Sequence, residues 1–119
     1  MQDLSELLSY IAENVDGAQY VALGGSDGLL VEQHPEQGQN LSAYTAEMTN
    51  TLTALTKLNT AGFDGGPVKE MMVTSEKSIS YTRRLNDDFF LLVLMNPAGN
   101  LGKVRLYTEQ VAPKMLELF

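Results

Sequence analysis

The sequence FFLLVLM, residues 89–95, decides the fold of this chain. A strand with one face in water alternates apolar and polar residues, and this stretch does not alternate. We therefore expect both of its faces to be covered, which places it in the middle of a sheet with helices on either side. A membrane-spanning helix needs about 20 apolar residues, so the run is too short for that role.

Two more strands are predicted directly before this one, over residues 67–74 and 78–85. Short polar turns at 76–77 and 86–88 separate the three segments, which predicts an antiparallel meander.

An earlier pair of strands, residues 18–23 and 28–34, is joined by Gly24-Gly25-Ser26-Asp27-Gly28. Such a glycine-rich segment could hold a phosphate, but a phosphate loop leads into a helix and is usually completed by a lysine or hydroxyl side chain. Here Leu29-Leu30-Val31 follows, which is typical of a strand, and the first lysine is Lys57. We therefore predict a hairpin turn.

Helical periodicity predicts helices over residues 3–14, 41–61 and 101–118, the last with Pro113 expected to bend or divide it. The order is thus helix, two strands, helix, three strands, helix, an α+β arrangement. With residues 89–95 central, the five antiparallel strands take the order 2-1-5-4-3. The first and third helices are expected on one face and the second on the other.

The second predicted helix is unusually poor in charge, with only Glu47 and Lys57 between residues 41 and 61. One stripe carries its large apolar residues, Leu41, Tyr44, Met48, Leu52, Leu55 and Leu58. The remaining surface is small and uncharged: Thr45, Ala46, Thr49, Asn50, Thr53, Ala54, Thr56 and Thr60. An exposed threonine-rich helix is one interpretation. We favour a second buried face, because such residues suit close approach to another surface.

The predicted edge strand 67–74 carries Met71-Met72-Val73, and an uncovered edge invites pairing with another chain. Two copies joined at this edge, with their second helices side by side across a two-fold axis, would cover both surfaces. The predicted dimer interface consists of Met48, Thr49, Leu52, Thr56, Met71, Met72 and Val73.

Catalytic patterns are not found in the 119 residues. There is no cysteine, and the single histidine, His34, stands at a predicted strand end, so neither a triad nor a zinc site is indicated. Arg83-Arg84 could act as an arginine finger, although solvent-facing strand arginines are commoner. We expect no enzyme activity, no bound metal and no cofactor.

A net charge of −7 with scattered basic residues argues against nucleic-acid or anionic-membrane partners. The amino-terminal residues lack a basic region followed by an apolar stretch, so we expect a cytoplasmic protein. We find no linker composition and expect one domain over residues 1–119.

The segments Val15-Asp16-Gly17-Ala18 and Ser26-Asp27-Gly28-Leu29-Leu30-Val31 resemble the opening motif of the roadblock domain family. LLVLMNPAGNLGKVR, residues 91–105, and the element order also fit this family, so the resemblance covers nearly the whole chain. It implies a profilin-like sandwich, a homodimer joined edge to edge, and a non-enzymatic role as regulator or scaffold of a Ras-like small GTPase of the MglA type.

By this resemblance, the paired second helices would contact the GTPase through Glu47, Asn50, Thr53, Ala54 and Lys57. Regulation would then work by repositioning the switch residues of the GTPase itself. Some regulators of this family carry a C-terminal extension, and this sequence departs from them by ending at Phe119 directly after the third helix. We therefore expect binding or scaffolding rather than activation.

Two alternatives stay open. One is a self-associating structural module without a GTPase partner. The other is a small-molecule sensor of longin or profilin-like architecture, which would need a pocket of a few hundred Å³ where we expect large side chains to fill the space.

Overall fold

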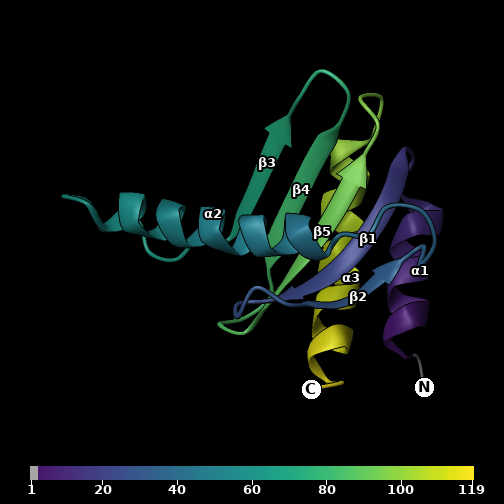
Figure 1. Cartoon of the computed structure of the whole chain (residues 1–119), viewed down its shortest axis with the longest axis horizontal. Coiled ribbons are helices and arrows are strands. Elements are labelled where there is room, and N and C mark those ends of the chain that lie inside the picture. Colours follow the sequence, from purple (N-terminus) through teal and green to yellow (C-terminus); the bar gives the residue numbers. More distant parts are fainter. Residues whose placement is uncertain (1–2) are drawn as a thin grey trace.

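The computed structural model describes residues 3–119, which form a five-stranded antiparallel sheet with helices on both faces (Figure 1). The elements in chain order are α1 (Leu4–Asn14), β1 (Ala18–Gly25), β2 (Leu30–His34), α2 (Ser42–Thr60), β3 (Glu70–Thr74), β4 (Ile79–Arg84), β5 (Phe89–Met95) and α3 (Leu101–Leu116). The strand order is β2-β1-β5-β4-β3, so the predicted α+β class and topology are confirmed. In Figure 1, α2 lies in front of the sheet, and α1 and α3 lie behind it.

Strand β5 is covered on both faces, as its uninterrupted apolar sequence predicts. It pairs with β1 on one side and β4 on the other. Leu91 and Val93 join the larger core beneath α1 and α3, whereas Phe90 and Leu92 join a smaller core beneath α2. The side chains of Leu91, Leu92 and Val93 are fully excluded from solvent.

The glycine-rich segment is a hairpin turn, as predicted, but the turn lies two residues later than expected. Gly24 and Gly25 belong to β1, and the chain reverses over residues 26–29. The amide of Gly25 donates to the carbonyl of Leu29 at 2.9 Å, and Gly28 has the positive φ (+89°) that favours glycine. The segment therefore leads from strand to strand, and no helix begins at it.

Gly24 has a second role that the sequence pattern did not indicate. A Cβ atom at this position would lie 2.7 Å from Cγ2 of Thr45 on α2 and 2.7 Å from Cζ of Phe90 on β5. The missing side chain thus lets α2 approach the sheet closely at this point.

Two predicted features differ in the structure. Strand β3 begins at Glu70 rather than at Pro67, and helix α3 continues through Pro113 to Leu116 without being divided. Pro113 removes the backbone hydrogen bond to the carbonyl of Glu109, but it stands in the last turn of α3, so only the few residues that follow it are affected. No helix in the described part of the chain is long and apolar enough to cross a membrane.

Substituting Gly24→Ala should destabilise the protein by about 2 kcal/mol, because the added methyl group meets two packed side chains. Chemical denaturation measures the loss. Gly102→Ala is the matched control, since a Cβ there meets only Oδ1 of Asn100 at 3.5 Å, and its stability should be unchanged or slightly higher. Equal stability of Gly24→Ala and the natural sequence would show that this contact does not constrain the fold.

Candidate interaction surface

Helix α2 rests on its own sheet over only its first half. Its buried residues are Thr45 and Met48, both in that half. Beyond them Leu58 is 66% exposed. Figure 1 shows the helix crossing the sheet and continuing past β3, the edge strand. Beyond Leu52, which still packs on the smaller core, α2 therefore extends past its own sheet.

The predicted apolar stripe of α2 is split between two directions. Leu41, Met48 and Leu52 pack on the core beneath the helix, as expected. Thr45 joins them on the buried side, whereas the sequence pattern predicts it on the opposite, small and uncharged surface. Thr45 fits because Gly24 leaves room for its methyl group and because its hydroxyl donates to the carbonyl of Leu41 at 2.8 Å.

The rest of the stripe lies on one flank of the helix. Tyr44 is 37% exposed, and its hydroxyl hydrogen-bonds Oγ of Ser80 on β4 at 2.8 Å. A groove of about 500 Å³ follows this flank, with Tyr44, Glu47 and Leu94 among its walls. Spacings of three, four and seven residues return to the same side of a helix, so Thr51, Leu55 and Leu58 continue this flank beyond the groove.

The residues predicted for a dimer interface occupy different environments. Met48 is only 7% exposed within one chain, and the Thr49 hydroxyl donates to the carbonyls of Gly25 and Thr45. Leu52 and Thr56 are half-buried. On β3, Met71 and Met72 are half-buried on opposite faces of the sheet, and Val73 is 43% exposed.

The residues expected to contact a GTPase are all exposed. They lie on the side of α2 that points away from the sheet: Glu47, Asn50, Thr53, Ala54 and Lys57. Within this set only the two end residues are charged, so the middle of the surface is small and neutral.

The two edges of the sheet differ in regularity. Strand β2 pairs with β1 through a bulge, because Leu23 faces Glu32 but Gly24 faces Leu30, which leaves Val31 extra. Carboxylates also gather at this edge: burial raises the pKa of Glu32, and the charges of Glu36 and Asp3 raise it further. Bulges and charges are the usual protections of an edge strand.

Strand β3, in contrast, pairs with β4 in an unbroken register from Glu70 opposite Arg83 to Thr74 opposite Ile79. Its outer edge has no neighbouring strand within residues 3–119. This edge is therefore the better suited of the two for pairing with another strand.

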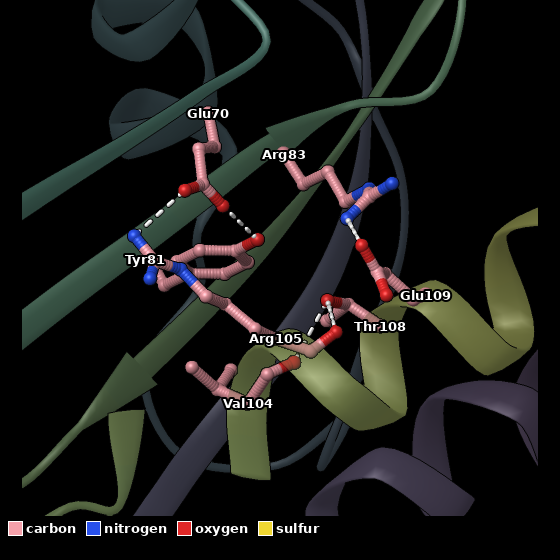
Figure 2. A network of polar contacts seen from close by, with 7 residues as sticks. All are labelled: Glu70, Tyr81, Arg83, Val104, Arg105, Thr108 and Glu109. Atoms are coloured by element: carbon pink, nitrogen blue, oxygen red, sulfur yellow. Dashed lines mark hydrogen bonds and ion pairs between the residues drawn. The ribbon is translucent and has the colours of Figure 1, made fainter. Parts of the chain in front are cut away.

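A polar network holds β3 in place from behind the sheet (Figure 2). The hydroxyl of Tyr81 on β4 donates to Oε2 of Glu70 at 2.6 Å, and the guanidinium of Arg105 on α3 lies 2.7 Å from Oε1 of the same carboxylate. The Tyr81 side chain is fully buried. Glu70 thus connects the edge strand to β4 and to α3.

Both groups of the Glu70–Tyr81 pair have shifted pKa values. The hydrogen bond from Tyr81 lowers the pKa of Glu70 below its ordinary 4.5; partial burial opposes this, and the charge of Arg105 adds to it. Burial raises the pKa of Tyr81 above its ordinary 10.0, and the hydrogen bond to Glu70 raises it further. At neutral pH the pair is therefore a phenol donating to a carboxylate.

The two adjacent arginines are both paired within the chain. Arg83 lies 3.4 Å from Glu109 on α3, with its side chain only 17% exposed, so it does not simply face solvent. Arg84 contacts Asp87 in the β4–β5 turn. His34 ends β2 at a half-buried position, and no group of three potential metal ligands occurs within residues 3–119.

Sequence reasoning did not find the network around Glu70. Its members come from three elements, and only their side-chain lengths and the register of β3 on β4 bring them together. The alternation of Ile79, Tyr81 and Arg83 along β4 was the one local signal, since it places Tyr81 and Arg83 on the face that α3 covers.

Comparison with known proteins adds a family match and several similar folds. The family model described as Roadblock/LC7 domain matches residues 4–95. Among solved structures, MglC from Myxococcus xanthus is 28% identical, covers 96% of this chain and 97% of its own, and has a TM-score of 0.65. No curated protein sequence matches the chain.

Two other solved structures are more similar in shape and less similar in sequence. MglB from Myxococcus xanthus has a TM-score of 0.83 at 15% identity, with 99% of this chain and 98% of that chain covered. A Roadblock/LC7 domain from Streptomyces avermitilis has a TM-score of 0.82 at 18% identity, with 97% and 99% covered. At such identities these two likenesses concern the fold.

Replacing Glu70→Gln should lower the free energy of unfolding by about 1 kcal/mol near neutral pH, because the charge that Arg105 and Tyr81 stabilise is removed. Since the pKa of Glu70 is lower in the folded chain, this stabilisation is complete above the ordinary value of 4.5 and is lost as the pH falls through the lowered value. Denaturation at about pH 7 and about pH 3 should show the gap between the two proteins closing in acid. A gap that stays constant or widens in acid would contradict the pairing.

Proposed function

Because the chain belongs to the Roadblock/LC7 domain family, we propose that it is a homodimeric, non-enzymatic protein that binds a Ras-like small GTPase of the MglA type and regulates or scaffolds it. The observation that carries the proposal is helix α2, which extends past its own sheet and exposes apolar side chains on one flank and small neutral ones outward. The likeness to MglB and MglC supports the same class of protein.

The dimer would form by antiparallel pairing of β3 with β3 of a second copy. Val73 faces Ser80, whose side chain bonds Tyr44 on α2, so Val73 lies on the α2 side of the sheet. In such a dimer the overhanging half of α2 would cover this side of the partner sheet. Two exposed apolar side chains, Leu58 and Val73, would then be removed from water.

The α2 helices would pack against each other along the flank of Tyr44, Thr51, Leu55 and Leu58. In an antiparallel pair centred on Thr51, Tyr44 of one helix lies opposite Leu58 of the other, because both are seven residues from the centre. The groove beside Tyr44 would receive the partner's Leu58. The proposed interface differs from the one predicted from the sequence. It keeps the residues of β3, and the flank of Tyr44, Thr51, Leu55 and Leu58 replaces Met48, Thr49, Leu52 and Thr56.

Pairing of the helices would leave Asn50, Thr53, Ala54 and Lys57 outward on each copy, with Glu47 at the seam. We propose this doubled surface as the GTPase contact. Its small neutral middle permits close approach, and regulation would act by moving the GTPase's own switch residues.

We further propose that the roadblock domain extends over the whole chain, beyond the matched residues 4–95. Val104, Val111 and Met115 of α3 are buried in the larger core, so the sheet needs this helix to close its second face. The protein would act in the cytoplasm, where a GTPase partner would be found.

Leu58→Asp should dissociate the dimer, with a dimer dissociation constant raised about 100-fold or more, because two copies of the side chain are buried across the axis. Sedimentation would then report the 13.1 kDa protomer. Leu29→Asp is the matched control, since Leu29 is also 66% exposed but lies beside the bulged edge. Equal association of both variants, or a natural protein that is monomeric at micromolar concentration, would exclude this dimer.

The register of the helices has a test of its own, because the chain contains no cysteine. Thr51→Cys should cross-link with its own copy on mild oxidation, whereas Thr60→Cys, near the end of α2, should not. Efficient cross-linking of Thr60→Cys with none of Thr51→Cys would shift the helix register and overturn the centre on Thr51.

GTPase binding is tested by titrating MglA-type GTPases from the same source, in GDP and GTP-analogue forms, and by measuring hydrolysis with and without this protein. Ala54→Arg should weaken binding about tenfold or more by blocking the neutral middle of the surface, and Glu13→Arg, at an exposed position of α1, should not. If the GTPase bound in neither nucleotide form while the dimer stayed intact, GTPase binding would be excluded and a self-associating structural module would remain.

A further inference from the structure

We infer that a second groove, on the opposite flank of α2, is a binding site for a small organic acid with an apolar body and one carboxylate. The groove has a volume of about 410 Å³ and lies between the second half of α2, the segment before β3 and the β4–β5 turn. This size falls within the range of small-molecule sites and near its lower end, which suits one compact ligand. It also departs from our expectation that large side chains fill this space.

The floor of the groove is apolar. Leu52 of α2, Val68 before β3 and Phe90 of β5 contribute apolar side chains to its lining. Phe89 also borders the groove, but its ring packs against the larger core and Phe119 on the other face of the sheet. Phe90 is 3% exposed and its ring is fixed in the smaller core, so this wall is rigid. An aromatic or aliphatic body can therefore be buried here without rearranging the core.

The polar part of the lining selects an anion. Thr49, Thr53 and Thr56 face the groove, but each hydroxyl already donates to a backbone carbonyl, so these residues offer methyl groups and acceptors. The charged donors are Lys57 and Arg84. Of the ion pairs within residues 3–119, none involves Lys57.

Arg84 is only partly neutralised. Its partner Asp87 sits in the exposed β4–β5 turn with 91% of its side chain in solvent, and a guanidinium has five N–H donors. Two cations against one carboxylate leave the groove positive on a chain whose net charge is −7. A carboxylate is therefore attracted to this groove and repelled by most of the remaining surface.

The site does not depend on the proposed dimer. The groove follows the flank of Thr49, Thr53 and Thr56, whereas the helix pairing uses the flank of Tyr44 and Thr51. A ligand here would contact Thr53 and Lys57, which also belong to the outward surface of α2. A ligand in the groove would therefore affect the binding of a partner protein to the outward surface of α2.

The test is an amide NMR titration of the whole protein with 4-phenylbutyrate, and with 4-phenylbutyramide as the neutral control. We expect shifts at Thr53, Val68 and Phe89 with the acid, and about 3- to 10-fold weaker binding of the amide. Lys57→Gln and Arg84→Gln should each weaken binding of the acid by a similar factor. Lys77→Gln, in the β3–β4 turn outside the groove, should leave it unchanged.

Asp87→Asn gives a result that damage to the fold would not mimic, because removing the competing carboxylate should tighten binding of the acid. Equal binding of acid and amide, weaker binding by Asp87→Asn, or no shifts at these residues would overturn the site. A third probe, acetyl-Phe-Asp-amide, tests whether the carboxylate belongs to a free small acid or to a protein segment. If this peptide bound tenfold more tightly than 4-phenylbutyrate, the ligand would be a protein segment and the small-acid site would be overturned.

Discussion

The structure depends on the burial of β5 on both of its faces. A strand that is apolar throughout cannot leave either face in water, so it needs a helical layer on each side and a strand on each edge. β1 and β4 pair with β5 on its two sides. α1 and α3 cover one face of the sheet, and α2 covers the other. The two layers are unequal, because two helices close one face and only half of a helix closes the other.

This inequality connects the fold to the surfaces that other molecules can reach. α2 is held close to the sheet at one place, where Gly24 makes room for Thr45 beside Phe90. From there the helix continues past the edge strand with apolar side chains on one flank and a groove lined by Lys57 and Arg84 on the other. A helix fixed at one end over its own sheet and free at the other is suited to join a second body, which is why we assign recognition to α2.

The sequence was most informative where one residue pattern belongs to one element. The run at residues 89–95 predicted the central strand, and the turns between apolar segments predicted the meander and the first hairpin. It was less informative about α2, because Tyr44 and Thr45 are neighbours in the chain and either could face a sheet. The ion pairs of Glu70, Arg83 and Arg84 could not be predicted at all, since their geometry depends on the packing of separate elements.

The amino-acid sequence by itself thus determined the order of the strands, the sides on which the helices lie and the scarcity of charge on α2. These follow from periodicity and composition, which are local properties of the chain. Only the tertiary structure decided which side of α2 is buried, where the helix leaves the sheet and which edge strand is regular. Those features depend on the shape of the surface that each element meets, and this surface is built by residues distant in sequence, such as Gly24 and Phe90 beneath Thr45.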